Sequence, residues 1–311
     1  MRVALVKELG RPPEPTEIDD PAGEGDVVDM VAVSLNPIDL AVAAGRFYGG
    51  HPELPYVPGC EGVGRRDGTL VHLFGGGLGL RRDGTLAERV AAPEGTAVEL
   101  PAGVDAAIAS ACGIAGLAAW VPVTRDADVA EGDRVLVLGA TGTLGGIAVQ
   151  AAKLRSAERV VAAGRNRERL ERTRELGADE TVVLEGDDLA ARFKEACGGE
   201  GPTVVIDPLW GEPVAAAADA AAPRARIVHM GQSAGPTAAF TSAAVRSKEL
   251  RIQGYSDFLL SYDERRRYYL ELVDHAQAGR IAIDVERFPL DRVADAWEAQ
   301  ARGAKAVVEL T

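Results

Sequence analysis

The chain changes its pattern of apolar and polar residues near residue 112. Before that point the apolar runs are short and are separated by turn segments rich in glycine and proline. Such runs predict short β-strands joined by tight turns, and no long amphipathic helix interrupts them. The predicted strands cover residues 3–6, 27–35, 69–74 and 86–92. We therefore expect a β-rich first domain.

From Arg134 onward, unbroken apolar strands alternate with helical segments. A strand that is apolar on both faces is typical of a parallel sheet covered by helices on both sides. This part of the chain is therefore expected to form a doubly wound α/β domain. The predicted strands are RVLVLGA, RVVAAGR, ETVVL, TVVIDP and RIVHMG, and the predicted helices cover 143–155, 167–176, 187–197 and 213–222.

The tail from about residue 247 returns to a mixed pattern. It predicts the strands ELRIQGY, VERFPL and AKAVVEL, with helices over 262–278 and 292–302. Because this tail continues neither half of a doubly wound sheet, we expect it to complete the first domain. The predicted domains are therefore 1–112 together with 247–311, and 113–246.

Composition narrows the class of protein further. The 311 residues are 47% hydrophobic and 26% charged, which argues against disordered, collagen-like and membrane classes. A net charge of −13 argues against nucleic-acid binding, so any phosphate site must rest on a local basic patch. Cys60, Cys112 and Cys197 lie far apart in the sequence, which argues against a disulfide framework. Because the sequence contains neither a signal-peptide segment nor a long apolar run, we expect a cytoplasmic protein that contacts no membrane.

A glycine-rich turn lies between the first predicted strand of the α/β domain and the helix that follows it. Small residues in such a turn let backbone N–H groups approach a pyrophosphate at the helix N-terminus. Tight packing alone is the alternative, but the strand–helix units that follow in register favour a dinucleotide site. The predicted pyrophosphate-binding residues are Ala140, Thr141, Gly142, Thr143, Leu144 and Gly145.

The end of the second strand of this domain distinguishes between cofactors. In NAD-binding folds an acidic residue there binds the ribose 2′-hydroxyl, but here the position holds Arg165. Arg169 follows four residues later, within a basic island over 165–174. Both guanidinium groups can face one phosphate, so we predict NADPH as the cofactor. The alternative is a solvated helix face with Glu–Arg pairs, which Glu168 and Arg172 would suit.

Several stretches, spread over nearly the whole chain, resemble the zinc-independent quinone oxidoreductase branch of the medium-chain dehydrogenase/reductase superfamily. The resemblance implies a GroES-like catalytic domain in two segments, with a Rossmann domain inserted between them. It also implies a nicotinamide–substrate cleft between the domains and a homodimer built on the cofactor domains. The matching stretches are VAVSLNPIDLAVAAGRFYG, LPYVPGCEGVG, GDRVLVLGATGTLGGIAVQAAK, VVIDPLWG, VHMGQSAG and VRSKELRIQGY.

The resemblance also assigns roles to single residues. Asn36 and Asp39 match the NxxD motif near the nicotinamide, and Phe47 or Tyr48 matches an aromatic residue that follows it. Arg169 matches a basic residue that holds the 2′-phosphate in relatives. The loop beside the nicotinamide is matched by Gly231, Gln232 and Ser233.

Zinc-dependent relatives supply Cys, His, and Cys or Asp to a catalytic zinc, together with four closely spaced cysteines for a structural one. Here those catalytic positions hold Asn36, Cys60 and Ile114, and the four-cysteine segment is absent. Cys60 with His51 and His72 matches no known metal spacing, so we expect no metal site. His229 and His275 fall in a predicted strand and helix and are interpreted as structural.

These observations favour an NADPH-dependent, zinc-free reductase of a quinone or an α,β-unsaturated carbonyl compound, which spreads the developing charge over its own oxygen. Asn36 is expected to orient the nicotinamide or the substrate carbonyl, and either Tyr48 or water to donate a proton. Two alternatives stay open. One is an enoyl-thioester reductase; the other is an NADPH-binding sensor or structural protein, which Ala118 would suit because relatives often have threonine there.

Overall fold

The computed structural model describes residues 1–21 and 26–310, which form two compact units. The first unit comprises Met1–Ala115, Leu260–Gly279 and Ile283–Thr311, and the second comprises Gly116–Leu259 and Arg280–Ala282. The predicted α/β fold, with a β-rich part and a doubly wound parallel sheet, is confirmed, and the sheet of the β-rich part is mixed. Within the described residues, no helix has both the length and the apolar character needed to cross a membrane.

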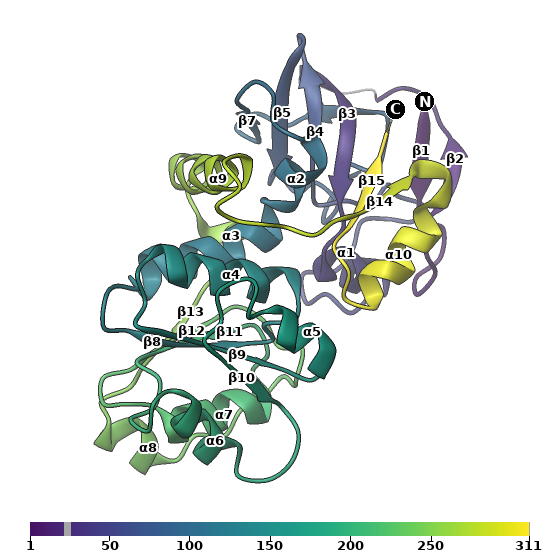
Figure 1. The fold of residues 1–311 in the computed structure, drawn as a ribbon. Coiled ribbons are helices and arrows are strands. Elements are labelled where there is room, and N and C mark those ends of the chain that lie inside the picture. Colours follow the sequence, from purple (N-terminus) through teal and green to yellow (C-terminus); the bar gives the residue numbers. More distant parts are fainter. Residues whose placement is uncertain (22–25, 311) are drawn as a thin grey trace. The chain divides into compact units, whose positions relative to one another are not determined.

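The second unit contains a six-stranded parallel sheet (Figure 1). Counted along the chain from β8, its strand order is 3-2-1-4-5-6, which is the Rossmann arrangement. Apolar side chains fill most of the five strands that the sequence predicted to be buried. In spatial order the strands are β10 (Glu180–Val183), β9 (Arg159–Gly164), β8 (Arg134–Leu138), β11 (Val204–Asp207), β12 (Arg226–His229) and β13 (Arg251–Gly254).

Helices cover both faces of this sheet. The helices α4 (Thr143–Leu154) and α5 (Arg167–Arg172) lie on one face, and α6 (Leu189–Ala196), α7 (Gly211–Ala220) and α8 (Ser242–Ser247) lie on the other (Figure 1). Phe193 of α6 and Val214 of α7 are fully buried against the strands. Except for α8, these are the predicted helices; α5 is four residues shorter than expected, because residues 173–177 form turns.

The predicted second domain boundary is wrong. Residue 247 was expected to begin the return to the first domain, but β13 pairs in parallel with β12, with Arg251 opposite Arg226 and Ile252 opposite Ile227. All four residues of β13 are exposed because it is the outer strand of the sheet. An edge strand need not be apolar on both faces, so RIQG lacks the pattern that identified the other five. The second unit therefore extends to Leu259.

The first unit contains a mixed sheet and a separate pair of strands. The mixed sheet follows the path β14–β15–β3–β4–β5–β7, in which only β14 and β15 run parallel to each other. The strand β6 also belongs to this sheet and pairs with β3. The separate pair consists of β1 and β2. The strands are β1 (Arg2–Leu5), β2 (Glu14–Glu17), β3 (Asp26–Ser34), β4 (Glu61–Arg66), β5 (Thr69–Phe74), β6 (Arg89–Ala92), β7 (Ala97–Glu99), β14 (Glu286–Pro289) and β15 (Ala306–Glu309).

A tight hairpin joins β4 to β5. Its two turn residues, Asp67 and Gly68, have φ angles of 50° and 80°, the left-handed values of a type I′ turn. The sequence predicted β5 but not β4, because EGVGRR combines two glycines with two arginines instead of an apolar run.

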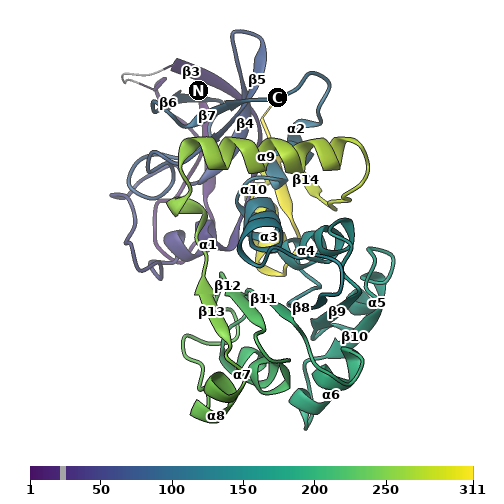
Figure 2. The ribbon, with the colours of Figure 1, turned by 90° about the vertical axis from the view of Figure 1, so that its left-hand side faces the viewer.

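The helices of the first unit pack on the mixed sheet or beside it. They are α1 (Pro37–Ala43), α2 (Ala106–Ala111), α9 (Tyr262–Gln277) and α10 (Val293–Ala301), while α3 (Ile114–Val121) crosses the boundary between the units. Figure 2 shows the length of α9, whose Tyr262 and Tyr269 hydroxyls donate to the carbonyls of Ala97 and Ala109. The returning C-terminal segments thereby complete the first unit, as the sequence predicted for α9, α10, β14 and β15.

Candidate functional site

The glycine turn after β8 leaves the beginning of α4 without a side-chain cap. Gly142 is the N-cap residue and contributes no side chain, and Gly139 adopts a left-handed φ of +66°. The N–H groups of the first helical turn have no partner within the helix, so they are available to an anion. The turn can therefore accommodate a phosphate group, and the binding role of its residues stays a prediction.

Gly145 is required by the close approach of α4 to the turn. A Cβ atom at this position would lie 2.4 Å from the carbonyl oxygen of Gly139 and 2.5 Å from the Cα of Ala140. Ala140 N also donates to the carbonyl of Ala163 in β9, over 2.9 Å. The backbone of the turn is thus fixed by packing on one side and by the neighbouring strand on the other.

Thr141 connects the turn to the end of the second strand. A Cβ at Gly164, the last residue of β9, would lie 2.7 Å from the Thr141 methyl carbon. Arg165 follows Gly164 directly, so the structure places Arg165 beside the turn residues with which the sequence grouped it. Asn166 then caps α5 by accepting from the backbone N–H of Arg169 over 2.9 Å.

The basic island over 165–174 divides into two parts. Arg172 of α5 pairs with Glu168 at 3.1 Å, and Arg174 in the turn after α5 pairs with Glu171 at 3.1 Å, so these two arginines already have carboxylate partners at the surface. Arg165 is exposed, and no carboxylate among the residues that the structure describes forms an ion pair with it. A guanidinium without an internal partner at this strand end is free to bind a phosphate.

The predicted nicotinamide loop lies at the same edge of the sheet, after β12. A Cβ at Gly231 would lie 2.5 Å from the carbonyl oxygen of Pro208, and Ala234 N donates to the carbonyl of Leu209. Gln232 and Ser233 are exposed. All the predicted cofactor residues therefore follow the carboxyl ends of parallel strands, which is where open α/β sheets bind ligands.

A polar pair at this edge was not assigned by the sequence analysis. Asp207 ends β11, is completely buried, and accepts from His229 Nδ1 at the end of β12 over 2.9 Å. The ring of Trp210 lies on the His229 ring with 4.1 Å between centroids. His229 was interpreted as structural because a single histidine in a strand carries no signal of its partner.

In the first unit, Asp39 has a local structural role. Its two carboxylate oxygens accept from the backbone N–H groups of Asn36 and Cys60, over 2.8 and 2.9 Å. The first of these bonds belongs to a capping box that begins α1, while the second ties α1 to the segment before β4. Burial raises the pKa of Asp39 to about 6, although these hydrogen bonds oppose the shift.

Asn36 belongs to a buried network that we call the Glu61 cluster: Ser34, Asn36, Glu61, His72 and Lys305, none more than 3% exposed. The Asn36 Nδ2 group donates to Glu61 Oε1 over 2.7 Å, and Asn36 Oδ1 accepts from Lys305 Nζ over 2.7 Å. Both ends of the carboxamide are thus bonded inside the protein. The structure thus gives Asn36 a role inside this cluster, while its expected role in orienting nicotinamide or substrate stays a prediction.

Glu61 is the centre of the cluster. Its Oε1 also accepts from Ser34 Oγ over 2.7 Å, while its Oε2 accepts from the N–H of Ile114 over 2.6 Å. His72 Nε2 lies 3.2 Å from the same Oε2. Burial alone would raise the pKa of Glu61, but the hydrogen bond from His72 and the charge of Lys305 outweigh it and lower that pKa.

Lys305 provides the positive charge of the cluster. Its ammonium group donates to the carbonyl of Leu35 over 2.9 Å and lies 3.9 Å from Glu61 Oε1. Burial lowers the pKa of Lys305, while Glu61 opposes that shift. Sequence analysis missed this residue, although a lysine beside the apolar run AVV was a usable signal: a lysine in such a place is buried only if it is paired.

Tyr48 lies apart from these buried groups. It is 92% exposed, and its ring packs at 4.5 Å on that of Phe47, the other aromatic candidate. The phenol hydroxyl can therefore exchange protons with solvent or a ligand. Asn36 and Asp39, by contrast, are buried and bonded within the first unit, so the structure does not bring the three predicted catalytic residues into one accessible group.

The residues at the predicted zinc-ligand positions do not fit a metal. Asn36 is bonded at both ends of its carboxamide, and Ile114 has an apolar side chain. Burial and the neighbouring Asp39 raise the pKa of the Cys60 thiol well above its usual value, which disfavours the thiolate that binds metals. No group of three or more His, Cys, Asp or Glu side chains that could hold an ion exists among residues 1–21 and 26–310.

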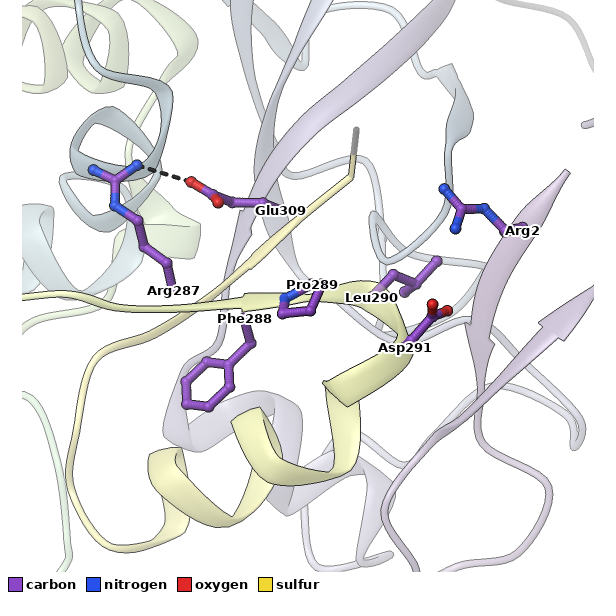
Figure 3. Close-up of a pocket in the computed structure, with 7 residues that line it drawn as sticks. All are labelled: Arg2, Arg287, Phe288, Pro289, Leu290, Asp291 and Glu309. Atoms are coloured by element: carbon purple, nitrogen blue, oxygen red, sulfur yellow. Dashed lines mark hydrogen bonds and ion pairs between the residues drawn. The ribbon is translucent and has the colours of Figure 1, made fainter.

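A surface pocket of about 150 Å³ lies elsewhere in the first unit (Figure 3). It is lined by Arg2, Arg287, Phe288, Pro289, Leu290, Asp291 and Glu309. Its arginines already have carboxylate partners, because Arg287 pairs with Glu309 and Arg2 pairs with Glu88. None of the predicted site residues contributes to it, so we do not assign it to the candidate site.

Comparison with known proteins adds three findings. Residues 143–274 match the family described as zinc-binding dehydrogenase. The chain is 28% identical over 301 residues to a phenolphthiocerol/phthiocerol polyketide synthase of Mycobacterium tuberculosis, covering 91% of this chain but only 13% of that protein. It is 25% identical to the quinone oxidoreductase of Lama guanicoe, covering 96% of this chain and 93% of that protein.

Among solved structures, the chain is similar to the quinone oxidoreductase of Thermus thermophilus, which was also determined in complex with NADPH. The TM-score is 0.81 at 28% sequence identity, and the similarity covers 100% of both chains. The order of elements along the whole chain is therefore shared with that enzyme.

The Glu61 cluster predicts a strong energetic coupling between its charges. Lys305→Met leaves a buried carboxylate without its cation, and we expect it to lower the free energy of unfolding by about 3–5 kcal/mol. Glu61→Gln should also be destabilising, because it leaves the Lys305 ammonium without an anion. The double variant removes both charges and should lose clearly less than the sum of the two single losses. Denaturant unfolding of all four proteins at neutral pH measures this coupling; additive losses would show that the pair is not coupled.

Proposed function

The chain belongs to the quinone oxidoreductase branch of the medium-chain dehydrogenase/reductase superfamily, and we propose that it is an NADPH-dependent reductase of quinones or α,β-unsaturated carbonyl compounds. The observation that carries the cofactor assignment is the exposed Arg165 at the end of β9. In an NAD-specific site that strand end provides an acid for the ribose 2′-hydroxyl. Here a guanidinium stands beside the phosphate-binding turn instead.

The bound dinucleotide would supply a hydride from its nicotinamide ring. The uncapped first turn of α4 would hold the pyrophosphate of this cofactor through backbone N–H groups, and Arg165 would hold its 2′-phosphate. Arg169 lies one helical turn further and can join Arg165. The loop of Gly231, Gln232 and Ser233 supports the opposite half of the molecule.

The polar side chains of the first unit favour hydride acceptors whose reduction needs little acid catalysis. The polar side chains of the Glu61 cluster are bonded to one another and shielded from solvent, so they provide no open electrophilic group. A quinone or an enone spreads the developing negative charge over its own conjugated system. We assign delivery of the proton to the exposed Tyr48 hydroxyl or to water.

A reductase of enoyl thioesters is the second candidate. The match to a polyketide synthase over 91% of this chain favours it, and an enoyl thioester is a conjugated acceptor of the same kind. A protein that binds NADPH without turnover is the third, and Ala118 is the residue that suggests it. Turnover with any conjugated acceptor separates the first two candidates from the third.

We also propose that the protein forms a homodimer through β13. This strand is the outer edge of the parallel sheet, and all four of its residues are exposed. An unpaired strand edge can pair with the same edge of a second copy. We expect light scattering to give about twice the chain mass of 32.5 kDa. Ile252→Arg, which places a charge on the edge, should shift the protein toward monomer; a monomeric wild type would contradict the proposal.

The cofactor assignment predicts a marked preference for NADPH. Charge-assisted bonds from one or two guanidiniums to the 2′-phosphate should favour NADPH over NADH on the order of 10²-fold in Kd. Arg165→Asp should reverse the order, because an aspartate repels the phosphate and accepts from a free 2′-hydroxyl. Arg167→Ala, at a neighbouring exposed arginine, serves as the matched control and should change the ratio little. Equal use of NADH by the wild type, or an unchanged ratio in Arg165→Asp, would refute the assignment.

The reaction itself is predicted to be a metal-independent reduction. Turnover of quinones, enals or enoyl thioesters with NADPH should exceed oxidation of ethanol or a secondary alcohol with NADP⁺ by roughly tenfold or more, because Asn36 and Ile114 at the ligand positions do not suit a metal that would stabilise an alkoxide. Chelators should leave this activity unchanged. Elemental analysis near one zinc per chain, together with loss of activity on chelation, would overturn the metal-free mechanism. Flat traces for the whole panel, with tight NADPH binding, would favour the non-catalytic candidate.

A further inference from the structure

The Asp207–His229 pair occupies a distinctive place in the second unit. The two residues end adjacent parallel strands and lie opposite each other in the register of β11 and β12. They stand at the carboxyl edge of the sheet, where the predicted cofactor residues also gather. Neither the proposed hydride reaction nor the binding of the phosphates uses them.

The hydrogen bonds of Asp207 select one tautomer of the neutral His229 ring. One oxygen of the buried carboxylate accepts from the N–H groups of Leu209 and Trp210, each over 2.9 Å, and the other accepts from His229 Nδ1. The carboxylate oxygen accepts from Nδ1, so in the neutral imidazole the proton is on Nδ1 and Nε2 is the acceptor. The His229 side chain is 25% exposed, and no partner of its Nε2 is found among the described residues.

Trp210 holds the imidazole from one side. Its ring lies 4.1 Å from that of His229 and contacts Phe240 edge-on at 5.5 Å. The backbone of Trp210 adopts a φ of +59° and a ψ of −158°, a region that bulky residues avoid. Strained conformations of this kind persist where the surrounding structure enforces them, and they are frequent at ligand sites. The histidine is therefore held rigidly and points one ring nitrogen away from the carboxylate.

The topology of the sheet determines which part of a dinucleotide reaches His229. The pyrophosphate turn follows β8, and the 2′-phosphate site follows β9, so the adenosine half extends toward β9. The other half must extend in the opposite direction, over the ends of β11 and β12. Neighbouring strands are about 4.8 Å apart, which places the end of β12 about 10 Å from that of β8.

We propose that His229 is a binding residue for the nicotinamide half of the cofactor, with Nε2 accepting a hydrogen bond from a hydroxyl of its ribose. Asp207 is then a positioning residue, because it fixes the tautomer and the orientation of the ring. This assignment rests on the proposed dinucleotide site. It adds to that site a side chain that holds the reactive half of the ligand.

The test compares two ligands that share the adenosine half. NADPH contains both halves, whereas 2′,5′-ADP contains only the adenosine half with its 2′-phosphate. For His229→Phe, which keeps a ring against Trp210 but has no acceptor, we expect the Kd of NADPH to rise about three- to tenfold, the range for one neutral hydrogen bond. The Kd of 2′,5′-ADP should stay within about twofold of the wild-type value.

Three further variants separate binding from folding. His229→Gln places a carbonyl oxygen near the position of Nε2 and should recover part of the lost NADPH affinity. Asp207→Asn should weaken NADPH in the same direction without affecting 2′,5′-ADP. Phe240→Leu is the matched control, because it disturbs the same aromatic contacts without removing an acceptor, and should leave both Kd values unchanged.

The possible results are distinct. An unchanged Kd of NADPH in His229→Phe, or an equal loss for both ligands, would overturn the role of His229 while leaving the dinucleotide site intact. A wild-type protein that binds neither ligand would overturn the proposed function itself, and the His229 assignment with it. Selective loss of NADPH affinity, partly restored by glutamine, is the result that supports the assignment.

Discussion

The carboxylate of Glu61 imposes the strictest constraint on the first unit. A charge with no exposure to solvent costs several kcal/mol unless its surroundings replace the lost water. The replacement comes from segments far apart in the sequence: Ser34 at the end of β3, Asn36 after it, His72 in β5, the N–H at the start of α3, and Lys305 before β15. The fold of this unit must bring all of them to one point.

The same constraint extends to residues that carry no charge. A Cβ at Gly113 would lie 1.7 Å from Glu61 Oε2, so only glycine leaves room for the carboxylate at this position. Tyr269 of α9 stacks on His72 with 4.2 Å between ring centroids and thereby holds the imidazole from the side opposite the strand. The C-terminal segments are thus needed to complete the environment of a residue in β4, which explains physically why the first unit is assembled from separate parts of the chain.

Sequence patterns identified the parts of the structure that one local physical factor determines, such as burial of a strand on both faces. Five buried parallel strands and the glycine turn before α4 were predictable because burial on both faces of a strand and a close strand-to-helix turn each leave a local pattern. β13 was misplaced because an edge strand is only partly governed by burial. Lys305, His72 and Asp207 were not assigned because their roles depend on partners that are distant in sequence, and no local pattern encodes such pairing. Asn36 was assigned by resemblance, but its bonds to Glu61 and Lys305 depend on this chain's own tertiary contacts.

The two units use polar groups in opposite ways. In the first unit nearly every polar atom of the Glu61 cluster is bonded to another, so the cluster stabilises the fold and offers nothing to a ligand. In the second unit the first turn of α4 has no side-chain cap, Arg165 is exposed, and His229 is bonded at one nitrogen only. Open donors and acceptors therefore gather where a dinucleotide would lie. A protein organised in this way is suited to holding a dinucleotide hydride donor, and under the proposed function the conjugated acceptor would stabilise its own charge.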